Sequence, residues 1–173
     1  MNLDEKIRTI PDFPKKGIMF KDITTVLQDA EALKFCIESF YEYYKDKQIT
    51  KVIGIESRGF IIAPALAYRL GVGFVPIRKP GKLPAEKIRQ EYQLEYGTDA
   101  IEIHTDSIRN GDRVLLHDDV LATGGTMKAA CSLVEQLGGE IVGISFLIEL
   151  AFLNPRMKLS NYDIHSLVSY ASE

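Results

Sequence analysis

Two adjacent carboxylates and the loop that follows them form the segment with the clearest chemical meaning. Asp118 and Asp119 end an apolar run that reads as a buried strand, and a helical pattern begins a few residues later. The loop between them consists of small and hydroxyl residues, namely Ala122, Thr123, Gly124, Gly125 and Thr126. Such a loop at a helix N-terminus offers free amides, hydroxyls and the positive end of the helix dipole to a phosphate monoester.

The two carboxylates have a different use, because they would repel a phosphate. Asp118 and Asp119 suit neighbouring hydroxyl groups, or a divalent cation, of the same ligand. A ribose phosphate meets both demands. The alternative interpretation is a strand-to-helix turn with an aspartate cap and glycines for tight packing, and Gly124-Gly125 alone would favour it. The paired aspartates and the threonines on either side of the glycines favour a binding site.

The loop also excludes two common nucleotide-binding classes. It lacks the lysine of a P-loop and the G-x-G-x-x-G spacing of dinucleotide folds. The sequence therefore lacks the main motif expected of a P-loop ATPase and that expected of a nicotinamide-dependent dehydrogenase.

A second segment, Arg78–Arg89, concentrates positive charge. It holds five Lys or Arg residues against one Glu, in a chain whose formal net charge is -3. It follows a predicted strand and contains Pro80, Gly81 and Pro84, so we expect a mobile loop at the same sheet edge, able to close over a pyrophosphate. A solvated basic loop is the equally weighted alternative for this segment alone. Arg58, at another strand end, adds a cation and favours the functional reading.

The elements around these residues alternate between strands and helices. We expect a helix over 29–44 with Asp29 as its N-cap, and a hairpin formed by 92–96 and 100–104 around Gly97-Thr98-Asp99. Strands are expected at 51–55, 73–78, 113–118 and 140–147, and helices at 59–70 and 125–137. This alternation predicts one α/β domain with a central parallel sheet flanked by helices on both faces.

The composition narrows the class of protein. The 173 residues are 46% hydrophobic and 26% charged, which fits one globular domain and excludes wholesale disorder. A net charge of -3 gives no sign of a general nucleic-acid surface. No apolar run is long enough for a membrane span, and the acidic start of the chain lacks a signal peptide's pattern, so we expect a cytoplasmic protein. Cys36 and Cys131 lie on apolar helix faces and are expected to be buried, reduced thiols.

Several stretches together resemble a known family. Asp118-Asp119 with residues 122–126 resembles the ribose-phosphate motif of type I phosphoribosyltransferases, which bind 5-phosphoribosyl 1-pyrophosphate (PRPP). Three further stretches are similar to the members of that family that use adenine: PDFPKKGIMFKDI at 11–23, ESRGF at 56–60, and RKPGKLP with LEYG at 78–84 and 94–97. The resemblance implies a type I phosphoribosyltransferase fold with a small N-terminal base-binding hood (1–28) and a flexible catalytic loop and hairpin (79–104).

The resemblance also implies an activity and a set of roles. The activity is purine salvage: PRPP and adenine give AMP and pyrophosphate, with Mg²⁺ held mainly by substrate oxygens and water rather than directly by the protein, on a homodimer. The roles assigned by matching position are Ala122–Thr126 for the 5′-phosphate, Asp118 and Asp119 for the ribose hydroxyls, Arg58, Arg78, Lys79 and Lys82 for the pyrophosphate, Met19, Phe20 and Lys21 for the base, and Glu95 as the catalytic carboxylate facing the purine. Lys21 stands where the family often has Arg, and His117 where a small apolar residue is more usual.

Two other functions remain open from the sequence. A phosphoribosyltransferase for another base, such as xanthine, would carry the same phosphate loop. A non-catalytic regulator that senses PRPP would need a nucleic-acid-binding element, and neither a helix-turn-helix extension nor a basic stripe outside Arg78–Arg89 is visible.

Overall fold

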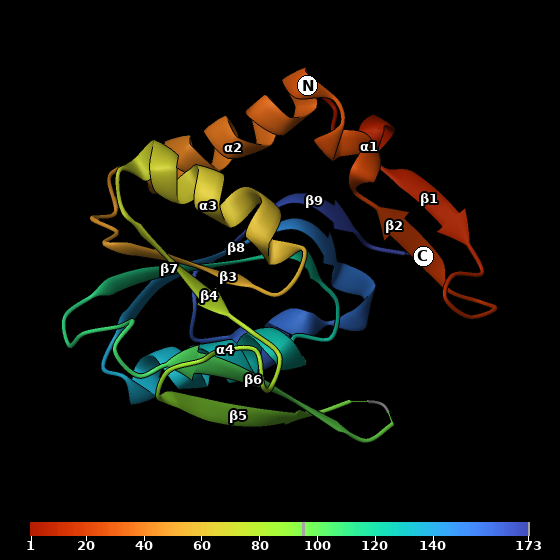
Figure 1. Ribbon diagram of the computed structural model, residues 1–173. Coiled ribbons are helices and arrows are strands. Elements are labelled where there is room, and N and C mark those ends of the chain that lie inside the picture. The colour runs from red at the N-terminus through yellow and green to blue at the C-terminus, as the bar shows by residue number, and fades with distance from the viewer. Residues whose placement is uncertain (95, 173) are drawn as a thin grey trace.

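The centre of the molecule is a five-stranded parallel sheet. The computed structural model describes residues 1–94 and 96–172. The strands of the sheet are β3 (Lys51–Ile55), β4 (Gly73–Ile77), β7 (Arg113–Leu121), β8 (Glu140–Leu150) and β9 (Ile164–Tyr170). Their order is β4-β3-β7-β8-β9, and every neighbouring pair is parallel. The predicted α/β class with a central parallel sheet is confirmed (Figure 1).

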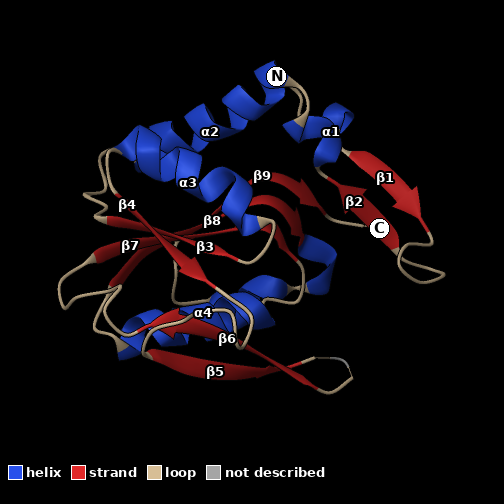
Figure 2. Ribbon diagram, viewed as in Figure 1, coloured by secondary structure: helices blue, strands red, loops and turns tan. Residues whose placement is uncertain are grey.

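Helices cover both faces of this sheet. The helices α2 (Ala30–Tyr44) and α3 (Gly59–Leu70) lie on one face, and α4 (Gly125–Gln136) lies on the other (Figure 2). A two-stranded sheet of β5 (Lys87–Gln93) and β6 (Thr98–His104) lies against α4. The second small sheet pairs β1 (Arg8–Pro11) with β2 (Met19–Asp22), ahead of the short helix α1 (Thr24–Leu27), and three 3₁₀ turns cover Asp4–Lys6, Ala151–Leu153 and Pro155–Leu159.

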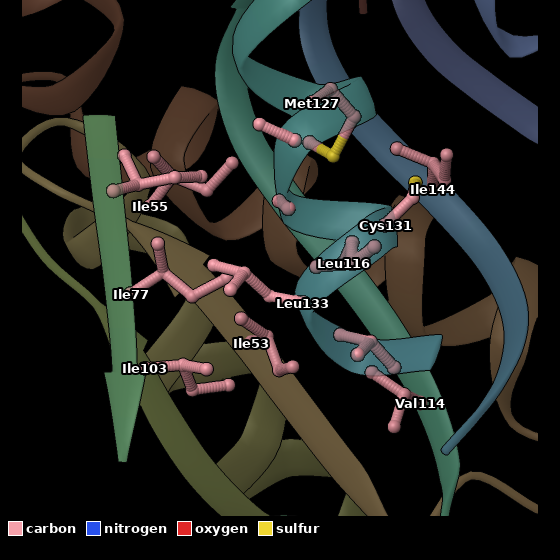
Figure 3. Close-up of a cluster of buried hydrophobic side chains, with 14 of the residues drawn as sticks. Ile53, Ile55, Ile77, Ile103, Val114, Leu116, Met127, Cys131, Leu133 and Ile144 are labelled. Carbon is pink, nitrogen blue, oxygen red and sulfur yellow. The ribbon is translucent and has the colours of Figure 1, made fainter. Parts of the chain in front are cut away.

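Two apolar clusters hold the layers together, one on each side of the sheet. Successive residues of a strand point to opposite faces, so Val52 and Ile53 belong to different clusters. On the α4 side, Cys131 and Leu133 gather with Ile53 (Figure 3). Burial raises the pKa of Cys36 to about 11 and that of Cys131 to about 12, so both are inert buried thiols, as predicted.

The helix predicted at 29–44 is confirmed with its cap. The Asp29 carboxylate accepts hydrogen bonds from the amides of Glu31 and Ala32, both at 3.1 Å. These bonds satisfy donors that have no partner within the helix. The helices predicted at 59–70 and 125–137 are also present, the second ending one residue earlier.

Several boundaries differ from the sequence prediction. β7 continues to Leu121, beyond the predicted end at Asp118, because pairing with β8 persists as far as Glu149. β4 ends one residue earlier than predicted, at Ile77, and β8 ends three residues later, at Leu150. The prediction that the loop at Arg78–Arg89 extends to Arg89 is wrong, because β5 already begins at Lys87. The middle of this loop is not free of the core either, because Leu83 is buried.

The hairpin is also longer than expected, and the strands β1, β2 and β9 were not anticipated. β6 begins at Thr98, so Thr98 and Asp99 belong to a strand and not to the turn. The base of the hairpin contributes Ile101 and Ile103 to the core, where both are buried. β9 escaped prediction because its half-buried, serine-containing sequence has no continuous apolar run.

The N-terminal segment forms the expected small unit beside the carboxyl end of β9 (Figure 1). The Tyr170 hydroxyl donates to the Asp4 carboxylate at 2.6 Å, and the Lys21 ammonium lies 4.0 Å from the centre of the Tyr170 ring. Within the unit, Asp22 is buried and accepts hydrogen bonds from Arg8 and Thr24. No helix of the described residues is long and apolar enough to cross a membrane.

Candidate active site

A cavity of about 470 Å³ opens where the strands β3, β4 and β7 end. In an open parallel sheet this edge is where ligands bind. The cavity is lined by Ile55, Glu56, Ser57, Arg58, Lys79, Tyr92, Asp118, Asp119 and Thr126. The structure therefore brings together predicted residues from all three chemical groups: the carboxylates, the phosphate loop and the cations.

The loop Ala122–Thr126, predicted to bind phosphate, borders a smaller cavity of about 80 Å³. This cavity shares the lining residues Asp118 and Thr126 with the first. α4 begins at Gly125, and no side chain caps its N-terminus in the part of the chain that the structure describes. Its first amides are therefore available to a ligand. Gly124 has φ of 80°, and a Cβ there would lie 3.0 Å from the Pro155 carbonyl oxygen, so only glycine fits this position without strain.

Asp118 and Asp119 lie side by side but in different electrostatic surroundings. Burial and the neighbouring charge of Asp119 raise the pKa of Asp118 well above its usual range. Burial also raises the pKa of Asp119, against the opposing effect of Arg58, whose Nε lies 2.7 Å from Asp119 Oδ2. Without a ligand, the surroundings therefore disfavour negative charge on both carboxyl groups at once.

A glycine allows the helix α3 to approach this pair. A Cβ on Gly59 would lie 3.0 Å from Asp118 Oδ1 and 3.0 Å from the His117 carbonyl oxygen. His117 itself does not line the cavity; it is fully buried, its Nδ1 lies 2.9 Å from Ser145 Oγ, and burial lowers its pKa to about 3. It is a neutral histidine of the core, packed edge-to-face on Phe40.

Each cation predicted to hold pyrophosphate is paired with a carboxylate. Arg78 donates to both oxygens of Glu56, at 3.2 and 3.3 Å, and the Lys82 ammonium lies 3.7 Å from the same carboxylate. Partial burial raises the pKa of Glu56, but the hydrogen bonds from Arg78 and from the Lys79 amide lower it by more. The pKa of Glu56 therefore lies below its usual range. Lys79 pairs with Asp99, as Arg58 pairs with Asp119.

The residues predicted to bind the base lie on β2, and one of them, Phe20, lies beside Arg58, which lines the cavity. The Phe20 ring lies 5.4 Å from the Arg58 guanidinium carbon and 5.1 Å from the Phe13 ring. Met19 and Lys21 flank it, and the Lys21 side chain donates to Thr9 Oγ1 at 3.0 Å. The predicted catalytic residue Glu95 lies outside the described residues.

Sequence reasoning missed three residues that organise the site. Glu56 lies two positions before Arg58 in the sequence, but its partners are Arg78 and Lys82, which follow the next strand. Asp99 was assigned to a turn, and Tyr92 to a hairpin strand without a role. Their importance depends on pairings between segments distant in sequence, which no local pattern records.

Comparisons with known proteins agree with this geometry. The family model described as "Phosphoribosyl transferase domain" matches residues 22–164. The chain is 57% identical over 170 residues to an adenine phosphoribosyltransferase of Alkaliphilus metalliredigens, covering 98% of this chain and 100% of the relative.

Two solved structures of adenine phosphoribosyltransferases are also similar. The enzyme from Thermoanaerobacter pseudethanolicus superposes with a TM-score of 0.94 at 55% identity, covering 97% of this chain and 98% of that one. The enzyme from Trypanosoma brucei, solved with AMP, pyrophosphate and ribose-5-phosphate, gives a TM-score of 0.89 at 30% identity, covering 96% and 78%.

The fold and the site thus define a phosphoribosyltransferase. More narrowly, the chain belongs to the adenine phosphoribosyltransferases, the purine-salvage enzymes that convert adenine and PRPP to AMP and pyrophosphate.

The raised pKa of Asp118 predicts that Asp118→Asn stabilises the ligand-free protein at neutral pH. Because the folded state binds this proton more readily than the unfolded chain, the parent loses stability as pH rises through the folded pKa. The uncharged amide does not, so its melting temperature should exceed the parent's by about 2–4 °C, equivalent to ~1 kcal/mol for a chain of this size.

Thermal melts between about pH 5 and about pH 8 measure this difference, which should widen toward high pH. Asp106→Asn, at an exposed position, is the matched control and should show no such trend. A lower melting temperature for Asp118→Asn at every pH would contradict the electrostatic account.

Proposed function

We propose that the residues of the cavity divide the transfer of the 5-phosphoribosyl group to adenine as follows. The loop Ala122–Thr126 and the N-terminus of α4 hold the 5′-phosphate, and Asp118 and Asp119 accept hydrogen bonds from the ribose hydroxyls. One observation carries this proposal: an uncapped helix N-terminus and two carboxylates border two cavities that share Asp118 and Thr126. A sugar phosphate presents the phosphate and the vicinal hydroxyls that these two features bind.

The pyrophosphate side of PRPP is held by Arg58, Arg78, Lys79 and Lys82. Arg58 and Lys79 line the cavity. Arg78 and Lys82 form ion pairs with Glu56, which also lines it. As pyrophosphate departs, negative charge builds on it and an oxocarbenium-like sugar forms. Fixed cations that neutralise that charge act where the transition state needs them.

Magnesium is proposed as part of the same site. Among the described residues, no group of three or more His, Cys, Asp or Glu side chains could hold a metal ion. We propose that Mg²⁺ is bound mainly by substrate oxygens and water, which is a usual mode of binding for that ion. When bound, Mg²⁺ would neutralise part of the charge on the pyrophosphate.

The free edge of β2 supports main-chain recognition of the base. Within residues 1–94 and 96–172, β2 pairs with β1 alone, and Pro11 lies opposite Met19 in that ladder. Pro11 has no N–H, so the flanking pair Ile10–Phe20 carries the ladder bonds, and the backbone groups of Met19 and Lys21 face outward. There an amide can donate to N1 of adenine, and a carbonyl can accept from its 6-amino group.

Glu95 is proposed as the carboxylate that faces the purine. Adenine attacks the sugar through N9, and its ring gains positive character as the bond forms. A carboxylate near N7 stabilises that charge and can accept the proton. Glu95 falls in the sequence between β5 and β6, and the end of β5 lies beside the loop 122–126: a Cβ on Gly125 would lie 3.6 Å from the Gln93 carbonyl oxygen and 3.7 Å from the Tyr92 ring.

The proposal extends to the setting of the reaction. We place the enzyme in the cytoplasm as a homodimer, with no nucleic-acid or membrane partner. The buried free thiols Cys36 and Cys131 support a reducing compartment. The dimer follows from the family resemblance.

Base specificity tests the proposed function directly. Hypoxanthine and guanine reverse both groups of the recognised edge, which leaves buried polar atoms unpaired and can lower kcat/KM by about 10⁴-fold. Incubation with PRPP, Mg²⁺ and each purine base, followed by identification of the nucleotide, measures this order. Phe20→Ala should weaken adenine binding by about 1–3 kcal/mol without changing the order, because every base has a stacking face. Comparable kcat/KM for adenine and hypoxanthine, or preference for xanthine, would favour the other transferase.

The role of Glu95 predicts a split between kcat and KM. Glu95→Gln should lower kcat by about 10²-fold while the KM of each substrate changes little, because the carboxylate acts in the transition state. Steady-state kinetics measure both constants. Glu91→Gln, at an exposed position of the same hairpin, is the matched control. If the two variants behave alike, Glu95 has no catalytic role.

A further inference from the structure

Three side chains next to the cavity bind one another in a closed cluster. The Lys79 ammonium donates to the carboxylate of Asp99 and to the Tyr92 hydroxyl, the latter at 3.0 Å. The Tyr92 hydroxyl donates to the same Asp99 oxygen at 3.1 Å. The cluster therefore fixes the Lys79 side chain, which would otherwise have four freely rotating bonds.

The members of the cluster differ in their access to the site. Lys79 and Tyr92 line the cavity, whereas Asp99 is not among its lining residues. An ammonium group has three N–H donors, and the cluster uses two of them. The third remains for an oxygen of the leaving group. Asp99 thus acts on the site through Lys79 and Tyr92.

The cluster also spans two segments of the chain. Lys79 follows β4, while Tyr92 and Asp99 lie opposite one another in the β5–β6 hairpin. Further bonds join the same segments: Arg78 and Glu102 exchange both backbone hydrogen bonds, at 3.0 and 2.8 Å, and the Gly81 amide donates to the Glu102 carboxylate at 3.1 Å. The basic segment at 78–82 and the hairpin are therefore connected at several points, and of the connections just described only the Lys79 cluster lines the cavity.

The charges of the cluster are stable at neutral pH. Partial burial lowers the pKa of Lys79, but its hydrogen bonds to Asp99 and Tyr92 raise it by more. The pKa of Lys79 therefore lies above the usual lysine value. The bond from Lys79 holds the pKa of Asp99 below its usual range. Both groups are charged when the enzyme works.

We propose that Asp99 is a positioning residue that couples the binding of pyrophosphate at Lys79 to the placement of the β5–β6 hairpin. An anion that takes the third donor of Lys79 draws the ammonium toward the cavity, and Asp99 and Tyr92 transmit that displacement to the strands on either side of the hairpin connection. The inference rests on the proposed assignment of Lys79 to the pyrophosphate.

This coupling has a signature that a purely structural role lacks. Asp99→Asn keeps the size of the side chain but removes a negative charge from beside Lys79, so anion binding should not weaken. The hairpin, however, follows the ammonium less closely, because the amide oxygen of Asn accepts a weaker hydrogen bond than a carboxylate does. We therefore expect kcat to fall by about 10-fold, a cost typical of a small misplacement of reacting groups, while the Kd of inorganic pyrophosphate with Mg²⁺ rises by no more than about twofold.

The experiment uses steady-state kinetics and calorimetry on the full chain. Asp99→Glu should recover part of kcat, and Asp106→Asn, an exposed aspartate just beyond β6, should match the parent. The double variant Lys79→Met/Asp99→Asn should have nearly the kcat of Lys79→Met alone, because Asp99 acts through Lys79.

Different outcomes separate this inference from the assignment on which it rests. Parental kinetics for Lys79→Met would overturn the placement of the pyrophosphate at Lys79. An impaired Lys79→Met together with a parental Asp99→Asn, or with losses that multiply in the double variant, would overturn the coupling alone. Parallel losses of kcat, pyrophosphate affinity and melting temperature in Asp99→Asn would show a structural role instead.

Discussion

The site depends on two adjacent carboxylates held at the end of the central strand beside a helix N-terminus. Asp118 and Asp119 are costly there, because burial and mutual repulsion disfavour their charged forms. Several features serve to keep them in place: the continued pairing of β7 with β8, the missing side chain of Gly59, and the guanidinium of Arg58. A ligand that brings hydroxyl donors to the carboxylates stabilises their charged forms, and its phosphate satisfies the uncapped amides at the start of α4.

The cations of the site are also held by groups of opposite charge. Arg58, Arg78, Lys79 and Lys82 are each paired with a carboxylate in the absence of a ligand. An acidic protein can in this way gather basic groups for a polyanionic substrate without presenting a basic surface. Under the proposed assignment of these cations to pyrophosphate, the ligand must share them with Glu56 and Asp99 or displace these carboxylates.

The sequence was sufficient for the features that depend on local patterns. The short apolar runs with intervening amphipathic helices predicted the parallel sheet, and Asp29 marked a helix start that the structure confirms. The phosphate loop was recognisable because its chemistry is contiguous. Features that depend on distant pairing were not: the extension of β7 requires β8, and the strand at Lys87 requires its partner at His104. Glu56 and Asp99 acquire their roles only when the fold brings cations to them.

The central claim is that the carboxylate pair recognises the ribose hydroxyls of PRPP. Calorimetric titration of Asp118→Asn/Asp119→Asn with PRPP and, separately, with adenine tests it most directly. Losing charge-assisted hydrogen bonds to the hydroxyls costs roughly 1.5–3 kcal/mol each, so PRPP affinity should fall far more than adenine affinity. Unchanged PRPP affinity in a folded double variant would contradict the account.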